Sequence, residues 1–149
     1  MSIDVSIRSL EKFDHERWKQ LWTDYLSFYK TSVSSAVYKT AFQRLVSHDL
    51  KEFQCIIAEV DGEIIGLSHY LFHRNLWSMR DTCYLSDLFV VPEYRGKGIA
   101  RRLIQKVAQH AKGCGVEGVY WMTQEFNYKG RMLYDQIAEK TPFIVYEIN

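Results

Sequence analysis

The stretch VPEYRGKGIARRLI, residues 91–104, constrains the fold of this chain more than any other part of the sequence. An apolar run over 82–91 leads into Pro92, which cannot donate a hydrogen bond to a sheet and therefore predicts the end of a strand. A turn containing Gly96 and Gly98 follows. The next apolar positions recur at the spacing of a helix that buries one face: Ala100, Leu103, Ile104, Val107, Ala108 and Ala111. A buried strand that passes directly into an amphipathic helix is typical of α/β proteins.

The turn between this strand and this helix has the composition of an anion site. The first N–H groups of a helix lack partners and lie at the positive end of the helix dipole. Glycines allow the backbone to approach an anion without an intervening Cβ. Four basic side chains lie in the same stretch: Arg95, Lys97, Arg101 and Arg102. We therefore expect a phosphate to bind at this helix start; the alternative is a glycine-rich turn whose charges are only solvated.

Two other phosphate motifs fit this turn less well. The P-loop requires serine or threonine after its Gly-Lys pair, but Lys97 is followed by Gly98. The dinucleotide fingerprint requires a third glycine where this chain has Arg101. The turn therefore belongs to neither of these two motifs.

The rest of the chain predicts a mixed sheet with helices. Asp61 and Gly62, between two apolar runs, are a strong signal for a tight hairpin turn. Strands are expected over 5–10, 53–60, 63–72, 82–91, 118–124 and 142–148, and helices over 14–30, 34–48, 100–113 and 127–139. Because no repeat, low-complexity tract or linker interrupts this order, we expect one domain over residues 1–149.

The composition excludes several classes of protein. With 149 residues and a net charge of +1, the chain is not built as a whole to coat nucleic acid or an acidic membrane. Its cysteines, Cys55, Cys83 and Cys114, form neither a disulfide framework nor a CxxC pair. The first two lie in apolar runs, which predicts a reduced, cytoplasmic protein. We expect no signal peptide, and no apolar stretch approaches the roughly 18 residues of a membrane helix.

Two motifs carry a resemblance to a known family. In RGKGIA, Arg95, Gly98 and Ala100 fill the fixed places of motif A of the GNAT superfamily of N-acetyltransferases, which this chain resembles. The later stretch NYKGRMLYDQIAEK begins at Asn127, contains Tyr134 and resembles the second motif of that family. The last part of the chain looks most similar to small fungal acetyltransferases that act on histone, polyamine or D-amino-acid amines. The diamine acetyltransferases are the next neighbours.

The resemblance implies a single-domain GNAT fold of the α/β class: a mixed, mostly antiparallel sheet with a splayed parallel strand pair and about four helices. In such proteins acetyl-CoA, a cosubstrate, lies where two parallel strands separate, here 82–91 and 118–124. One strand amide there stabilises the developing oxyanion. The implied cosubstrate-binding residues are Leu88, Phe89, Val90, Arg95, Gly96, Lys97, Gly98, Ile99, Ala100, Arg101 and Asn127. The Asn127 amide can bind the pantetheine arm or only cap a helix.

The implied reaction is direct attack of an amine on the acetyl group in a ternary complex. Tyr134 would protonate the departing thiolate; the alternative is a core aromatic side chain. Asp87 is the candidate base, because Ser86 stands where related enzymes carry glutamate; the alternative is a structural hydrogen-bond acceptor. His69 and His73, two steps apart, can act as a base through water, contact the acceptor, or lie half-buried. No third ligand has suitable spacing, so no metal is expected.

The partners follow from the same patterns. We expect the acceptor to be a small-molecule amine or a protein lysine, because the sequence has no dense acidic cluster for a polyamine. We also expect a homodimer, because the apolar strand over 142–148 would leave an edge that invites pairing. Nucleic acid and membrane partners are not expected. The alternative functions are a non-catalytic module that binds CoA and a nucleic-acid binder that uses the basic patch 95–102.

Overall fold

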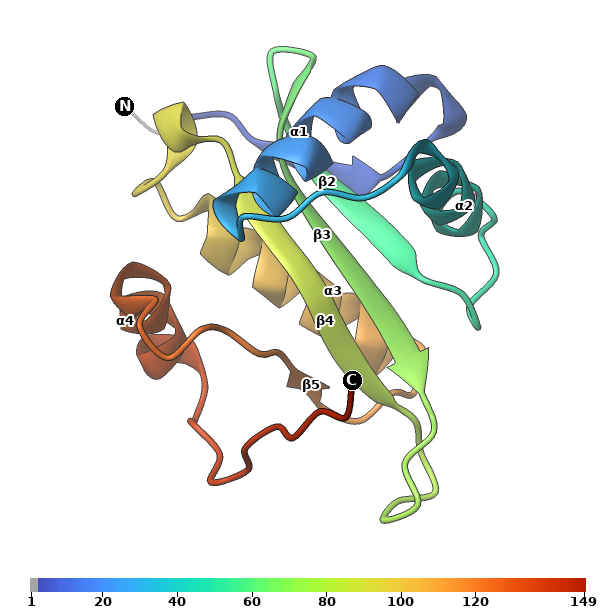
Figure 1. Ribbon diagram of the computed structural model, residues 1–149, viewed down its shortest axis with the longest axis vertical. Coiled ribbons are helices and arrows are strands. Elements are labelled where there is room, and N and C mark those ends of the chain that lie inside the picture. Colours follow the sequence, from blue (N-terminus) through green and yellow to red (C-terminus); the bar gives the residue numbers. More distant parts are fainter. Residues whose placement is uncertain (1–2) are drawn as a thin grey trace.

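One mixed sheet of five strands forms the centre of the computed structural model, which describes residues 3–149 (Figure 1). The strands follow the order β1-β2-β3-β4-β5, with bounds Ser6–Ser9, Gln54–Val60, Glu63–His73, Thr82–Val90 and Val119–Tyr120. Neighbours from β1 to β4 pair antiparallel, whereas β4 and β5 run parallel. The predicted mixed, mostly antiparallel sheet with one parallel pair is confirmed.

Four α-helices of the described chain surround this sheet: α1 His15–Phe28, α2 Ser35–Leu45, α3 Ile99–Gly113 and α4 Tyr128–Ile137. Figure 1 shows α1 and α2 on one face of the sheet, α3 on the other, and α4 beyond β5. α2 begins after Ser34, whose hydroxyl accepts a hydrogen bond from the Val37 N–H and so satisfies a free donor of the helix start. The four predicted helices are confirmed, and their bounds differ from the predicted ones by at most three residues.

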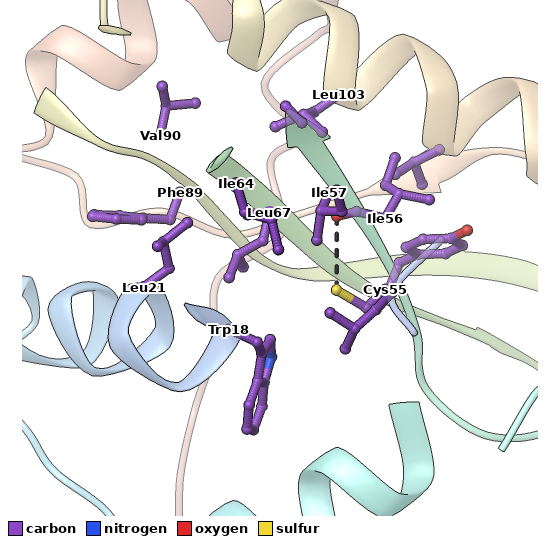
Figure 2. Close-up of a cluster of buried hydrophobic side chains, with 14 of the residues drawn as sticks. Trp18, Leu21, Cys55, Ile56, Ile57, Ile64, Leu67, Phe89, Val90 and Leu103 are labelled. Carbon is purple, nitrogen blue, oxygen red and sulfur yellow. Dashed lines mark hydrogen bonds between the residues drawn. The ribbon is translucent and has the colours of Figure 1, made fainter. Parts of the chain in front are cut away.

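The two faces of the sheet carry separate apolar cores. On one face, Trp18 and Leu21 of α1 are fully buried, as is Leu67 of β3. On the opposite face, α3 buries Leu103 completely. Figure 2 shows α1 below the sheet and α3 above it, with these side chains pointing inward. Each buried side chain of this kind contributes roughly 1.5–3 kcal/mol relative to an exposed one, so both helices hold β3 and β4 in place.

The predicted hairpin between β2 and β3 is confirmed. Asp61 and Gly62 have φ values of 50° and 78°, and the flanking Val60 and Glu63 pair with each other. Two consecutive residues with positive φ match the twist of a tight antiparallel hairpin.

The predicted strand over 142–148 is wrong. Residues 138–149 form neither helix nor strand, and their large apolar side chains are exposed, from 66% for Val145 to 102% for Ile148. A strand forms only where its N–H and C=O groups find a neighbouring strand. In residues 3–149 no strand pairs with this segment. The apolar pattern indicated strand propensity but not where the partner strand lies.

The predicted strand over 118–124 is also shorter than expected, because only Val119–Tyr120 pairs with β4. In the part of the chain that the structure describes, no helix is both long and apolar enough to cross a membrane.

Candidate active site

β4 and β5 separate soon after they meet. They pair only at Cys83 with Val119 and at Tyr84 with Tyr120. β4 then continues to Val90 while it remains paired with β3 on its other side. Alternate backbone groups on the β5 side of this stretch therefore lack a strand partner. A second extended molecule can use these groups as it would use a sheet edge.

The predicted cosubstrate contacts Leu88, Phe89 and Val90 lie on this unpaired part of β4. Phe89 and Val90 are buried, each 7% exposed, and Leu88 is half-buried. Their side chains therefore belong mainly to the core, and their backbone is what they offer to a ligand.

The turn that follows β4 leaves the start of α3 open. Gly96 and Gly98 have φ values of 75° and 80°, in the left-handed region that side chains other than glycine rarely adopt. Among residues 3–149, no side chain caps the first N–H groups of α3. A Cβ placed on either glycine would meet no atom within 4 Å, so the turn is unobstructed. Free amides, an open approach and the positive helix end together form a site suited to a phosphate.

The basic side chains near this turn differ in what they contact. Nε of Arg95 donates to the Val90 carbonyl at 2.8 Å, and the Arg95 guanidinium lies 5.4 Å from the Phe89 ring centroid. Nη2 of Arg102 donates to the carbonyl of Val5, just before β1. Lys97 is exposed. Arg95 and Arg102 thus have structural contacts as well as charge, whereas Lys97 projects freely toward solvent.

Tyr134 lies half-buried on α4. Its ring packs edge-to-face against Trp121, with centroids 5.5 Å apart. Burial, and then the phenol of Tyr29 just after α1, raise the pKa of Tyr134. The Tyr134 phenol therefore stays protonated at neutral pH and can donate a proton.

Asn127 caps α4, one of the two predicted roles for this residue. Its Oδ1 accepts from the Gly130 N–H at 3.3 Å, and its Nδ2 donates to Thr123 at 2.9 Å. A Cβ on Gly130 would lie 2.6 Å from Nδ2 of Asn127 and 3.2 Å from Cε2 of Tyr134. Glycine at 130 is therefore required for the cap and for the placement of the Tyr134 ring.

A hydrogen-bonded pair lies on the α1 face of the sheet. Nδ1 of His69 is 2.7 Å from Oδ2 of Asp87, and Nε1 of Trp18 donates to Nε2 of His69 at 3.0 Å. The pairing of β3 with β4 shifts here, because His69 lies opposite Asp87 whereas the next residue, Tyr70, lies opposite Leu85. This shift is a β-bulge with one extra residue in β4, and bulges often redirect side chains at functional sites.

The extra residue of the bulge is Ser86. Its hydroxyl donates to the His69 carbonyl at 3.2 Å, and its own carbonyl lies 3.5 Å from the Tyr25 hydroxyl. Burial, and then the neighbouring Asp87 carboxylate, raise the pKa of Tyr25. Tyr25 thus lies against the bulge that carries Ser86 and Asp87.

The two histidines of β3 have different partners. Nδ1 of His73 lies 2.8 Å from the Arg74 carbonyl, and its Nε2 lies 2.7 Å from the Tyr120 hydroxyl. His69 instead belongs to the buried pair with Asp87. Among residues 3–149, no cluster of three or more His, Cys, Asp or Glu side chains could hold a metal ion.

The sequence did not point to Trp18, Tyr25 and Tyr29 as a group around the site. The contacts of Trp18 with His69 on β3 and of Tyr25 with Ser86 on β4 depend on how α1 crosses the sheet, which no local pattern encodes. A cavity of about 290 Å³ lies elsewhere, lined in part by Gln54, Tyr70 and His110, and contains none of the predicted site residues.

Comparison with known proteins agrees with this geometry. Residues 15–138 match the Acetyltransferase (GNAT) family. The chain is 33% identical over 146 residues to D-amino-acid N-acetyltransferase HPA3 of Saccharomyces cerevisiae, covering 97% of this chain and 91% of that protein. It is 40% identical over 72 residues to thialysine N-epsilon-acetyltransferase of Mus musculus, covering 42% of each.

Solved structures share the fold. Aminoglycoside N-acetyltransferase AAC(6')-Iy in complex with CoA superposes with a TM-score of 0.85 and 19% identity, covering 100% of this chain and 97% of that one. The fold and the glycine turn define a GNAT acetyltransferase, and the chain belongs to this family. It is an acetyl-CoA-dependent N-acetyltransferase.

Proposed function

We propose that this protein is a single-domain enzyme that transfers the acetyl group of acetyl-CoA directly to the primary amine of a small molecule, in a ternary complex. The observation that carries the proposal is the turn Gly96–Gly98, which joins the unpaired part of β4 to the uncapped start of α3. In this segment, the unpaired backbone N–H and C=O groups of β4 are followed in the sequence by the free amide groups at the start of α3. A ligand with an amide-containing arm and a pyrophosphate suits such a surface.

In this proposal the pyrophosphate of acetyl-CoA binds the backbone amides from Gly96 to Arg101, including Ile99 and Ala100. Lys97 adds charge from an exposed position. The pantetheine arm pairs with β4 between Leu88 and Val90. A contact from Asn127 to this arm stays a prediction, since the Asn127 amide has bonds to Thr123 and Gly130.

The chemistry is a direct acyl transfer. The amine lone pair attacks the thioester carbonyl, a C–N bond forms, and the C–S bond breaks. A β4 amide stabilises the developing oxyanion, and Tyr134 donates its proton to the departing sulfur. The ammonium loses one proton before the attack, and the proton that the nitrogen loses after the attack passes through water and restores the Tyr134 phenol. Its raised pKa keeps the Tyr134 phenol protonated before the reaction, which a proton donor requires.

We propose that Asp87 receives the amine. Its side chain is 20% exposed, whereas that of its partner His69 is 4% exposed. A carboxylate at this place can bind an ammonium and accept its proton directly or through water.

The acceptor that we propose is the amino group of an amino acid or a similar small amine. The chain covers nearly all of a relative named as a D-amino-acid N-acetyltransferase, and a second relative is named for thialysine. One carboxylate, Asp87, suits a single ammonium better than a polyamine.

An amine panel tests this function. The wild-type protein and acetyl-CoA are incubated with D- and L-amino acids, thialysine, polyamines and a lysine-containing peptide. Free thiol release and the mass of the acetylated product are measured. We expect acetylation of amino acids with an enantiomer preference. Stabilisation by acetyl-CoA without acetylation of any amine would instead support the non-catalytic CoA-binding alternative.

We also propose a cytoplasmic homodimer. Cys55, Cys83 and Cys114 are free thiols, as suits a reducing compartment. The apolar side chains of segment 142–148 have no covering partner among the described residues. A second copy that pairs with this segment would remove that exposure.

A further inference from the structure

We infer that Trp18 and His69 form, with Asp87, a fixed hydrogen-bond chain that orients the Asp87 carboxylate toward the incoming amine. Trp18 and His69 are then positioning residues that act through Asp87. The inference rests on the proposed function, because it assigns to Asp87 the binding of the acceptor.

The donors and acceptors of this hydrogen-bond chain permit only one placement of its hydrogen atoms. The indole Nε1–H of Trp18 is a donor only, so Nε2 of His69 must accept its hydrogen bond. The ring hydrogen of a neutral His69 then lies on Nδ1, which donates to Oδ2 of Asp87 at 2.7 Å. Trp18 thereby sets the tautomer of His69, and His69 fixes one oxygen of Asp87.

Along this hydrogen-bond chain, burial decreases from Trp18 in the core to Asp87 at the proposed amine site. Trp18 is 0% exposed, the His69 side chain 4% and the Asp87 side chain 20%. Trp22 encloses His69 further, with ring centroids 5.6 Å apart and an interplanar angle of 74°. Both ring nitrogens of His69 are therefore engaged away from solvent. This arrangement makes His69 unsuited to take the proton of the amine directly, and Asp87 is the member of the chain that reaches outward.

The groups around Asp87 leave its carboxylate as the partner for a cation. They are His69 on β3, Tyr25 on α1, Tyr84 on β4 and Cys55 on β2. Burial, and then Asp87 itself, raise the pKa of Tyr25, Tyr84 and Cys55, so these three are neutral at physiological pH. An ammonium that approaches this region therefore finds one carboxylate in a fixed orientation.

Substitutions at His69 separate positioning from general packing. His69→Leu removes the donor, whereas His69→Asn places an amide N–H near the position of Nδ1. We expect His69→Leu to lower kcat/KM for the amine by about 10- to 100-fold, mainly through KM, because a misplaced group costs rates of this order. His69→Asn should restore most of this loss, and the affinity for acetyl-CoA should stay unchanged in both.

A double-substitution cycle tests whether His69 acts through Asp87. In an Asp87→Asn background, His69→Leu should reduce kcat/KM by less than about threefold, because the carboxylate that it positions is gone. Tyr70→Phe is the matched control. It removes a partly buried hydrogen bond of the adjacent residue, between the Tyr70 hydroxyl and Nδ1 of His110 at 2.7 Å, on the opposite face of the sheet. We expect it to leave amine kinetics unchanged.

The tautomer is measured without any assay of activity. In protein labelled with ¹⁵N-histidine, long-range ¹H–¹⁵N correlation spectra distinguish Nδ1–H from Nε2–H rings. We expect His69 as the Nδ1–H tautomer in the wild type, and loss of this single form in Trp18→Phe. An Nε2–H tautomer in the wild type, multiplicative effects in the cycle, or no recovery by His69→Asn would overturn the inference. A wild-type protein that shows the Nδ1–H form but acetylates no amine would instead overturn the proposed function.

Discussion

Arg101 of α3 donates a hydrogen bond from Nη2 to Oε1 of Gln136 on α4, with the two atoms 2.5 Å apart. This bond joins the helix that begins at the glycine turn to the helix that carries Tyr134. α4 buries none of its own side chains completely. The Arg101–Gln136 bond is therefore one of the contacts that hold α4, and with it Tyr134, against α3.

Removal of this bond should loosen α4. We expect Gln136→Ala to weaken acetyl-CoA binding by about 2- to 5-fold, because an exposed hydrogen bond contributes roughly 0.5–1 kcal/mol. Gln136→Glu keeps an acceptor for Arg101 and should bind acetyl-CoA as the wild type does or slightly more tightly. Calorimetric titration of both variants checks this, and equal affinities of Gln136→Ala and Gln136→Glu would contradict it.

Substitution of Gly98 in the Gly96–Gly98 turn should weaken the binding of acetyl-CoA. Gly98→Val introduces a Cβ at a left-handed φ of 80° and directs it into the open approach to the helix start. We expect acetyl-CoA affinity to fall by at least about 10-fold, because the side chain obstructs the approach of the anion to the helix start. The left-handed conformation itself costs stability, roughly 1–3 kcal/mol. Arg95→Ala should weaken binding less and make it less dependent on salt.

Gly62→Val is the matched control for this substitution. Gly62 also has a positive φ, 78°, and no atom within 4 Å of an added Cβ, but it lies in the β2–β3 turn. Both variants should lose similar stability in thermal unfolding, while only Gly98→Val should lose acetyl-CoA affinity in calorimetry. Wild-type affinity in Gly98→Val would show that this turn does not bind the pyrophosphate.

The sequence predicted the elements whose signals are local. The apolar residues of α3 recur at the spacing of a helix. The glycines of the Gly96–Gly98 turn indicate a backbone with positive φ, which few other residues adopt. The hairpin at Asp61 and Gly62 is equally local. These features agree with the structure because the residues that determine them lie within a few positions of one another.

The sequence could not predict features that depend on distant partners. Segment 142–148 has the composition of a strand, but strand formation requires a neighbour that the sequence pattern does not name. Trp18 and His69 are 51 positions apart, and their hydrogen bond follows from how α1 crosses β3. The β-bulge at Ser86 has no sequence signal of its own, and it brings Asp87 opposite His69.

A partly buried ion pair between Arg8 and Asp14 should contribute to the acid stability of the fold. Hydrogen bonds from the Arg8 guanidinium, 2.8 and 2.9 Å long, hold the pKa of Asp14 below its usual range. A depressed carboxyl pKa contributes stability above the unfolded value of 3.8, and this contribution is lost as the pH falls through the lower folded value. Asp14→Asn should lower the free energy of unfolding by roughly 1–3 kcal/mol at pH 7.

Urea unfolding between pH 2 and pH 7 checks this pair, over a range that spans both values of the Asp14 pKa. The difference in unfolding free energy between wild type and Asp14→Asn should be full at pH 7 and shrink below about pH 4. A difference that stays constant with pH would contradict the assignment.

A charge in the C-terminal segment 142–148 should prevent dimer formation. Ile144→Lys places a charge in an apolar segment that we expect to pair with a second copy, and it should convert a dimer into a monomer. Leu76→Lys is a control at another exposed apolar position, since Leu76 is 102% and Ile144 is 74% exposed. Sedimentation velocity at micromolar concentration should give dimers for wild type and Leu76→Lys. A monomeric wild type would contradict the proposed homodimer.

The proposed acid role of Tyr134 is tested by removal of its hydroxyl. Tyr134→Phe removes one oxygen and keeps most of the packing against Trp121. We expect acetyl-CoA affinity to stay within about twofold and the rate of acetyl transfer to fall by roughly 10- to 1000-fold. Tyr128→Phe, on the same helix and 71% exposed, is the control and should transfer at the wild-type rate.

The decisive measurement is a single-turnover quench-flow comparison of wild type, Tyr128→Phe and Tyr134→Phe, with acetylated amine quantified under conditions where chemistry limits the rate. We expect transfer to slow in Tyr134→Phe alone, with cosubstrate affinity retained. Full transfer by Tyr134→Phe would contradict the proposed acid role, because the thiolate would then leave without a proton from this phenol.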